Sequence, residues 1–200
     1  MYNIFLSIVS TLINSVLFKT INKKKSKVYS VKCISLIHSI MSSLGGILHF
    51  NDLISFQLHK YIVYYSLGYI AYDLELYTKI EELKKEKMIT YFHHLLFYIG
   101  ISYFPNEPKL YSLLIMTEIS TIPLNLMWIY KYEGNMRYFK IYSYIFYVSF
   151  FIFRILNCHY IFHSEYQSND YKKLGCIITF TGLNYYWFYL MTKKLIRHKF

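Results

Sequence analysis

The chain has 200 residues, of which 55% are hydrophobic, 21% aromatic and 16% charged, with 22 Lys and Arg against 11 Asp and Glu. Together with a mean hydropathy of +0.25, this composition is too apolar for an ordinary soluble domain and indicates a membrane protein with room for one domain. Cys33, Cys158 and Cys176 form no CxxC pair, which disfavours a disulfide framework or a structural zinc site.

Seven apolar stretches follow one another along the chain. In order they are 2–18, 29–50, 61–77, 88–104, 110–130, 138–162 and 174–192. A transmembrane helix needs about 20 largely apolar residues, and stretches of this length without period-2 alternation are helices, not barrel strands. Two stretches are short and two contain acids, so five to seven spans fit the pattern. We predict an all-α polytopic helical bundle with about seven spans.

The basic residues support the count of seven, because their density alternates from loop to loop. Loops 19–28, 78–87 and 131–140 and the C-terminal tail hold 16 Lys and Arg, whereas the alternate loops hold 4. Cytoplasmic loops attract these residues, so we expect a lumenal N-terminus and a cytosolic C-terminus. The runs lie at span ends, where they suit anionic lipid headgroups. Nucleic-acid binding is therefore not expected.

The first stretch is expected to be a retained anchor. It follows Met1 without a basic region and precedes lysines where a cleavage site would need small residues. We therefore divide the chain into a first transmembrane anchor with its basic cytosolic loop (1–28) and a main transmembrane domain (29–200). Seven spans use roughly 140 residues, so any activity is expected among the helices or at their cytosolic mouths.

Polar side chains inside the spans mark the interior of the bundle, because an ionisable group there costs about 2.5–3.5 kcal/mol and usually faces other helices or a wet cavity. These residues are His38, His49, Asp73, His93, His94, Glu118, Asn125, Arg154, Asn157, His159 and Asn184. A rise of about 1.5 Å per residue puts Asp73, His93, His94 and Asn125 at one level, roughly 6–9 Å from the cytosolic helix ends. Glu118 lies deeper, where Arg154 could pair with it or snorkel outward.

The adjacent histidines His93 and His94 allow two interpretations. A neutral imidazole can take a proton and return it, and a nearby carboxylate such as Asp73 fixes its tautomer, so His93 or His94 with Asp73 would suit acyl transfer. Alternatively, the histidines hydrogen-bond neighbouring helices and do no chemistry. A metal site is not expected, because no third ligand stands at a defined spacing.

Several short motifs then occur in an order that resembles a known family. They are Ser66-Leu67-Gly68-Tyr69-Ile70-Ala71-Tyr72-Asp73-Leu74, His93-His94, Glu118-Ile119-Ser120-Thr121 with Asn125 and Trp128, and Phe151-Ile152-Phe153-Arg154-Ile155. With His38-Ser39, Asn184 and Trp187 at the two ends, the chain resembles the TLC-domain family (TRAM, Lag and CLN homology), which includes the ceramide synthases. The resemblance covers some 150 residues.

The resemblance implies a helical bundle around a lipid-accessible cavity, with residues 29–200 as the TLC-like domain. In ceramide synthases adjacent histidines serve acyl transfer from acyl-CoA to a sphingoid base, which by resemblance would be His93 and His94. Those enzymes carry a His-Asp pair on the next helix, whereas this chain has Thr117-Glu118. The Glu-Ile-Ser-Thr pattern is closer to the TLC-domain-containing proteins outside the synthase branch.

The resulting hypothesis is a multi-pass protein of the endoplasmic reticulum or a connected membrane that acts in lipid homeostasis by binding, transporting or sensing a lipid. The alternative is a ceramide-synthase-like N-acyltransferase with acyl-CoA as substrate and no cofactor. The candidate catalytic residues are His93, His94 and Asp73, and the candidate cavity-lining residues are Glu118, Asn125, Arg154 and His38. Membrane lipids are the expected partners, and an oligomer is compatible with the sequence.

Overall fold

The computed structural model describes residues 2–103, 107–168 and 170–197, and in that part of the chain every regular element is helical. The α-helices are α1 (Tyr2–Asn22), α2 (Lys27–Phe50), α3 (Phe56–Lys79), α4 (Lys87–Tyr103), α5 (Pro108–Met116), α6 (Thr121–Tyr132), α7 (Met136–Phe150), α8 (Asn157–Glu165) and α9 (Tyr171–Ile196). A 3₁₀ turn at Thr117–Ser120 joins α5 to α6, and a π-helical segment at Phe151–Leu156 joins α7 to α8.

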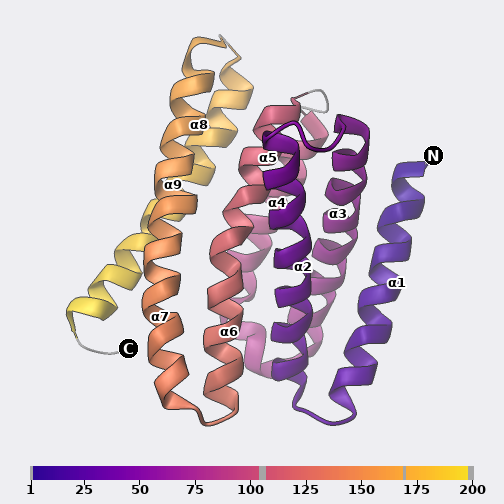
Figure 1. The fold of residues 1–200 in the computed structure, drawn as a ribbon, viewed down its shortest axis with the longest axis vertical. Coiled ribbons are helices and arrows are strands. Elements are labelled where there is room, and N and C mark those ends of the chain that lie inside the picture. Colours follow the sequence, from indigo (N-terminus) through magenta and orange to yellow (C-terminus); the bar gives the residue numbers. More distant parts are fainter. Residues whose placement is uncertain (1, 104–106, 169, 198–200) are drawn as a thin grey trace.

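These elements make seven rods that run up and down side by side (Figure 1). Each rod covers one of the seven apolar stretches, so the predicted all-α bundle is confirmed. α2 lies centrally and contacts α1, α3, α5 and α6. α1 stands at one edge of the bundle, and α7, α8 and α9 stand at the other (Figure 1).

Helix starts are fixed by short polar side chains that accept hydrogen bonds from the first free backbone amides. The Ser26 side chain accepts from Tyr29 N at the start of α2, and Ser55 accepts from Leu58 N at the start of α3. Asp170 does the same for α9. Polar residues between the apolar stretches therefore set where α2, α3 and α9 begin.

Four of the rods are long and apolar enough to cross a membrane by themselves. They are Phe5–Asn22, Lys27–Phe50, Pro108–Tyr132 and Met136–Glu165. α3 and α9 are longer than 20 residues but rich in tyrosine and charged at their ends, and α4 has 17 residues. The four apolar rods indicate a membrane protein. The other three rods pack among them in one bundle but are less apolar or shorter, so the number of spans stays approximate.

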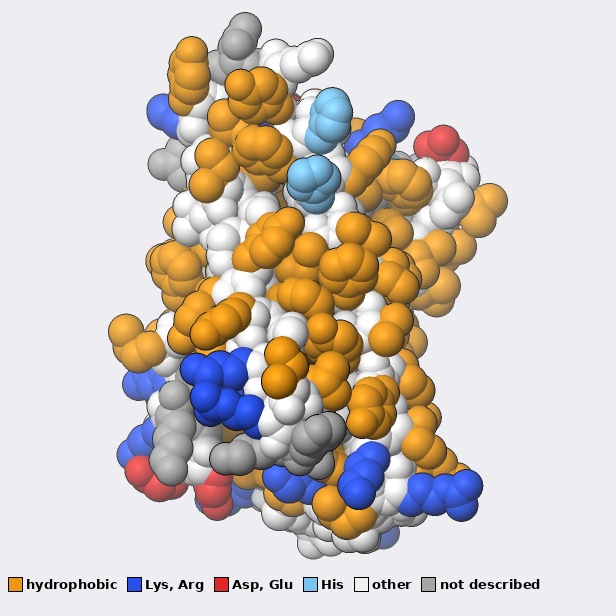
Figure 2. Space-filling model, turned by 90° about the vertical axis from the view of Figure 1, so that its left-hand side faces the viewer, with side chains coloured by type: hydrophobic (Ala, Val, Ile, Leu, Met, Phe, Trp, Pro, Cys, Tyr) orange, Lys and Arg blue, Asp and Glu red, His pale blue; other side chains and the backbone are white. Residues whose placement is uncertain are grey.

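Charge and apolar surface are segregated along the bundle. The turns α1–α2, α3–α4 and α6–α7 and the end of α9 all lie at one end, the lower end in Figure 1, and we call this the basic end. Figure 2 shows Lys and Arg side chains concentrated near this end and a belt of hydrophobic side chains above it. Leu44, Val148 and Ile152, which lie inside their helical rods, are about half exposed (51%, 55% and 45%). Such exposure at mid-helix suits contact with lipid chains.

α1 docks closely on α3 through small residues and hydroxyl groups. Ser7, Ser10 and Thr11 donate side-chain hydrogen bonds to backbone carbonyls of α3 at 2.7–3.0 Å. A Cβ atom on Gly68 would stand only 2.2 Å from the Ser7 carbonyl oxygen. Glycine is therefore required for this close helix approach, the small-residue contact common between membrane helices.

Candidate functional site

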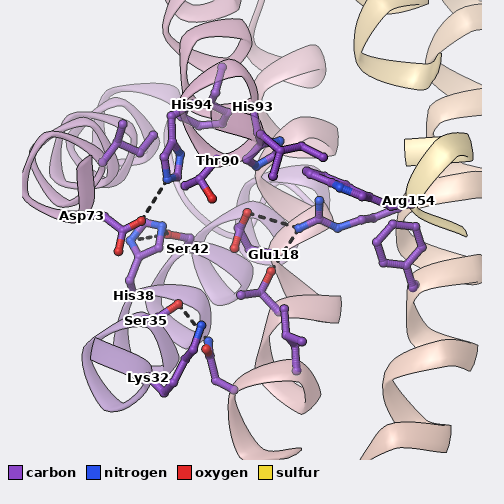
Figure 3. Close-up of a pocket in the computed structure, with 18 of the residues that line it drawn as sticks. Lys32, Ser35, His38, Ser42, Asp73, Thr90, His93, His94, Glu118 and Arg154 are labelled. Atoms are coloured by element: carbon purple, nitrogen blue, oxygen red, sulfur yellow. Dashed lines mark hydrogen bonds and ion pairs between the residues drawn. The ribbon is translucent and has the colours of Figure 1, made fainter. Parts of the chain in front are cut away.

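A cavity of about 420 Å³ lies inside the bundle. Residues of helices α2 to α7, of α9 and of the two irregular joints line it. Its lining includes all seven candidate site residues: His38, Asp73, His93, His94, Glu118, Asn125 and Arg154. Figure 3 labels all of these but Asn125 and shows them converging from α2, α3, α4 and the two irregular joints. The fold thus brings together polar groups that are up to 116 positions apart, from His38 to Arg154.

The structure distinguishes between the adjacent histidines. His94 Nε2 lies 3.1 Å from Asp73 Oδ2, across the contact between α4 and α3 (Figure 3). Both side chains are largely buried. If Nε2–H donates to the carboxylate, Nδ1 of His94 keeps its lone pair and can accept a proton. His94, and not His93, therefore has the arrangement that acid–base chemistry requires.

His93 points toward α9. Its ring centroid lies 5.8 Å from that of Phe180 and 5.3 Å from that of Trp187. His93 Nδ1 is buried and has no hydrogen-bond partner among the described residues. The ring thus packs mainly against aromatic side chains at the junction of α4 and α9, as a helix-packing residue would.

His38 lines the cavity below Asp73 (Figure 3). Its ring stacks on Tyr69 with a centroid distance of 3.8 Å and an angle of 11°. The ring nitrogens lie 3.4 Å from Ser42 Oγ, which in turn lies 3.0 Å from Ser66 Oγ. The hydroxyl of Ser42 on α2 therefore partners this buried imidazole and links it to Ser66 on α3. These serines were not singled out from the sequence, because they carry no charge.

Arg154 occupies the opposite wall on the π-helical segment. Its guanidinium donates to Ser120 Oγ at 2.8 Å, Thr121 Oγ1 at 3.0 Å and Asn184 Oδ1 at 3.3 Å, and lies 3.6 Å from Glu118 Oε1. The predicted pairing of Arg154 with Glu118 is thus observed, and snorkelling is not. π-helical turns are rare and occur frequently at functional sites.

Asn125 and Lys32 lie closer to the basic end. Asn125 Nδ2 donates to Ser35 Oγ at 2.9 Å, so this amide joins α6 to α2 and does not reach His94. Lys32 and Lys194 complete the lining at this end of the cavity. Lys32 carried a signal in the sequence, because it is one of two basic residues inside the predicted spans.

His94 also faces a second space. A mainly apolar groove of about 1030 Å³ runs between α1, α3 and α4, and His94 and Ile70 line both this groove and the cavity. The imidazole is therefore placed between a polar interior and an apolar groove.

The remaining polar residues of the spans lie away from the cavity. His49 Nδ1 lies 2.6 Å from Ser112 Oγ, and the His49 ring stacks on His59 at 4.4 Å. Asn157 Nδ2 donates to the Leu113 carbonyl at 2.7 Å. These contacts join helices, as expected for packing residues. Within the described ranges no group of three or more His, Cys, Asp and Glu could hold a metal ion.

The arrangement can bind an amphiphile and can support proton transfer. Apolar side chains supply most of the wall, while two carboxylates, one guanidinium and three imidazoles supply directed polar contacts. The Arg154–Glu118 contact compensates two charges, and the Asp73 contact orients His94. A ligand with a polar group near His94 and an apolar body fits this distribution.

A family model described as the TLC domain matches residues 28–193. The match covers most of the chain and contains the whole cavity lining apart from Lys194. Neither the search of curated proteins nor that of solved structures gave a match.

Proposed function

We propose that this chain, which belongs to the TLC-domain family, binds a lipid in the cavity and acts in lipid homeostasis by holding, moving or sensing that lipid. The observation that supports the proposal is the cavity itself. Its volume of about 420 Å³ falls within the roughly 300–1,000 Å³ of small-ligand sites. Its mixed lining lies in a bundle whose outer belt is apolar, so a lipid could reach it from the membrane.

Photo-crosslinking tests lipid occupancy directly. Cells expressing the protein would be fed a bifunctional fatty acid, irradiated, and the lipid attached to the purified chain measured. Leu124→Trp places a large ring in the cavity, because Leu124 lines it without a polar contact. The matched control is Leu44→Trp, at a position that is 51% exposed. We expect several-fold less crosslinking for Leu124→Trp and wild-type crosslinking for Leu44→Trp.

Equal crosslinking of both variants would argue against the proposal, because the lipid would then be bound to the outer surface. Mapping the crosslinked peptides separates the two cases further. Peptides from α2, α4 and α6 are expected for cavity binding, whereas a broad distribution over the belt would contradict it.

The alternative function is N-acyl transfer, and the His94–Asp73 contact of 3.1 Å favours it. In this reaction an amine attacks the thioester carbonyl of acyl-CoA, His94 Nδ1 removes the amine proton, and the thiolate leaves and takes up a proton. The amide product is an N-acyl lipid. Glu118 stands where the synthases carry their His-Asp pair, which is why binding remains the first proposal.

Lipidomics distinguishes the two functions. Membranes with equal amounts of wild type and His94→Ala would be compared for ceramides and other N-acyl lipids. An N-acyl product that rises only with the intact histidine would establish transfer. Under the binding proposal, neither variant changes N-acyl lipids, and the crosslinked lipid persists in His94→Ala.

The proposed location is the endoplasmic reticulum or a connected membrane, with the basic end in the cytosol. The concentration of Lys and Arg at one end of the bundle supports this orientation. Glycosylation acceptors inserted in 51–55 or near 166–170 are expected to be modified, and acceptors in 23–26 are not. Modification at 23–26 would overturn the orientation, and fractionation with markers for each membrane tests the location.

A further inference from the structure

Two lysines line the cavity at its basic end. Lys32 on α2 and Lys194 near the end of α9 both line the cavity, and we call them the mouth lysines. Lys32 lies below Ser35 and His38 in Figure 3, toward the basic end. Lys32 Nζ stands 6.0 Å from the Trp128 ring centroid, and Lys131 Nζ stands 4.6 Å from the same centroid.

The mouth lysines differ from Arg154, the other cationic residue of the lining, in having no carboxylate partner among the described residues. Arg154 has the Glu118 carboxylate at 3.6 Å. In contrast, no ion pair involves Lys32, Lys131 or Lys194 within the ranges that the structure describes. Lys32 is also partly buried, where an uncompensated charge is more costly than in water. The described residues therefore place no carboxylate within ion-pair distance of the mouth lysines, of which Lys32 is partly buried and Lys194 is exposed.

The spacing between the mouth and the histidines limits the ligand. Lys32 precedes His38 by six residues on α2, an axial distance of about 9 Å. Lys194 follows Trp187, which contacts His93, by seven residues on α9, or about 10 Å. Along both helices a mouth lysine is thus about 9–10 Å from a residue of the histidine region, His38 itself on α2 and the His93 neighbour Trp187 on α9. Ile70, Leu124, Phe150 and Leu190 supply apolar wall along the cavity.

We propose that the mouth lysines bind the phosphate of a phospholipid that places a single acyl chain in the cavity. This proposal rests on the lipid-binding function above and specifies the ligand. Ammonium groups bind phosphate through short, charge-assisted hydrogen bonds, and Trp128 borders the site at the height where aromatic side chains meet headgroups. The volume of about 420 Å³ suits a ligand with one chain.

A CoA ester also carries phosphate, but its geometry fits less well. In a phospholipid a short glycerol bridge joins the phosphate to the acyl ester. With the phosphate at the mouth, the ester group therefore lies between the mouth and the histidines, and the acyl chain extends farther into the cavity. The pantetheine arm of a CoA ester is considerably longer than a glycerol bridge. With its phosphates at the mouth lysines, its thioester would lie beyond His94, given the distance of about 9–10 Å.

Native mass spectrometry of the full chain in maltoside micelles tests the proposal, because maltoside contains no phosphate. The probes are oleoyl lysophosphatidate, mono-oleoylglycerol, which lacks only the phosphate, and oleoyl-CoA. The test variant is Lys32→Gln/Lys194→Gln. The matched control is Lys23→Gln/Lys24→Gln, which removes two exposed charges from the α1–α2 turn at the same end.

We expect the wild type to bind lysophosphatidate about tenfold more tightly than mono-oleoylglycerol. The mouth variant is expected to lose most of this preference while binding mono-oleoylglycerol as before, and the control variant to retain it. Equal affinity for the two lipids, or equal loss in both variants, would overturn the phosphate assignment alone. Lysine-dependent binding that is tightest for oleoyl-CoA would overturn the choice of a phospholipid.

Different results would contradict the proposed lipid-binding function itself. If mono-oleoylglycerol and lysophosphatidate both fail to bind the wild type, or if Leu124→Trp leaves their binding unchanged, the cavity is not a lipid site. In that case the mouth lysines lose their proposed role as well. If the mouth variant still binds mono-oleoylglycerol, and Leu124→Trp abolishes that binding, the cavity is a lipid site whatever the result for phosphate binding by the lysines.

Discussion

His94 on α4 contacts Asp73 on α3 through an Nε2–Oδ2 distance of 3.1 Å, and His94 stands between the cavity and the apolar groove. The contact spans 21 positions in the sequence and joins two helices that are linked by a 3₁₀ turn of mixed charge, Glu81–Glu86. A hydrogen bond to a carboxylate is worth about 1.5–3 kcal/mol when buried. The contact is therefore expected to stabilise the α3–α4 packing as well as to orient the ring.

A double-mutant cycle measures this contact. Asp73→Asn and His94→Gln are each expected to destabilise the protein, and the double variant should fall short of their sum by about 1 kcal/mol. The measurement is unfolding by SDS titration in mixed micelles. Asp73→Asn combined with His49→Gln is the control, since His49 contacts Ser112 and His59 instead. Additive effects in the first cycle would show that the two side chains do not interact.

Sequence patterns predicted the fold because few interactions determine it. Apolar length and the alternation of lysines between loops predicted an all-α bundle of about seven rods, which the structure confirms, while the orientation in the membrane stays a prediction. Both are local properties of the chain. The lining of the cavity could also be predicted, because most ionisable residues inside membrane helices face the interior. The expectation was wrong for His159, whose side chain is exposed.

The pairing of side chains could not be predicted. His93 and His94 point about 100° apart on a helix, so the choice of the one that meets Asp73 depends on how α4 is rotated in the bundle. Asn125 was expected at the level of His94, but it lies closer to the basic end and pairs with Ser35, a residue without charge to reveal it. The direction of Arg154 depends on the π-helical turn, which shifts the register of the following residues.

Gly68 is expected to control the docking of α1. In Gly68→Ala the new Cβ would approach the Ser7 carbonyl oxygen to 2.2 Å and Ser10 Cβ to 2.6 Å, so the two backbones must separate. We expect a loss of about 1–3 kcal/mol in thermal unfolding in micelles. Gly182→Ala in α9 is the control, because nothing lies within 4 Å of its Cβ. This control should gain about 0.5–1 kcal/mol, and equal stability of the two variants would contradict the close approach.

Lys173 is expected to hold the end of the bundle opposite the basic end. Its buried ammonium lies 2.8 Å from Glu107 Oε1 and 2.6 Å from Glu165 Oε2, joining the starts of α5 and α9 to the end of α8. Lys173→Met leaves the two carboxylates without this cation and should cost up to about 3 kcal/mol, since Glu107 is partly exposed. Lys172→Met, at an exposed neighbour, should be nearly neutral in the same melting experiment.

Arg154 provides the strictest test of the cavity wall. A lysine keeps the charge but cannot direct donors to Ser120, Thr121 and Asn184 at once, so Arg154→Lys should lose about 2 kcal/mol. Arg154→Met also removes the cation near Glu118 and should lose about 3–5 kcal/mol. Arg137→Lys, on the exposed start of α7, serves as the control and should be neutral.

A second substitution tests why Arg154→Met should lose more stability than Arg154→Lys. If Arg154→Met is costly because it leaves a carboxylate uncompensated, Arg154→Met/Glu118→Leu should regain part of the stability, because an apolar pair can replace a buried ion pair. Thermal unfolding in micelles measures this recovery. A double variant no more stable than Arg154→Met would show that the hydroxyl and amide contacts of Arg154, and not its charge, stabilise the wall.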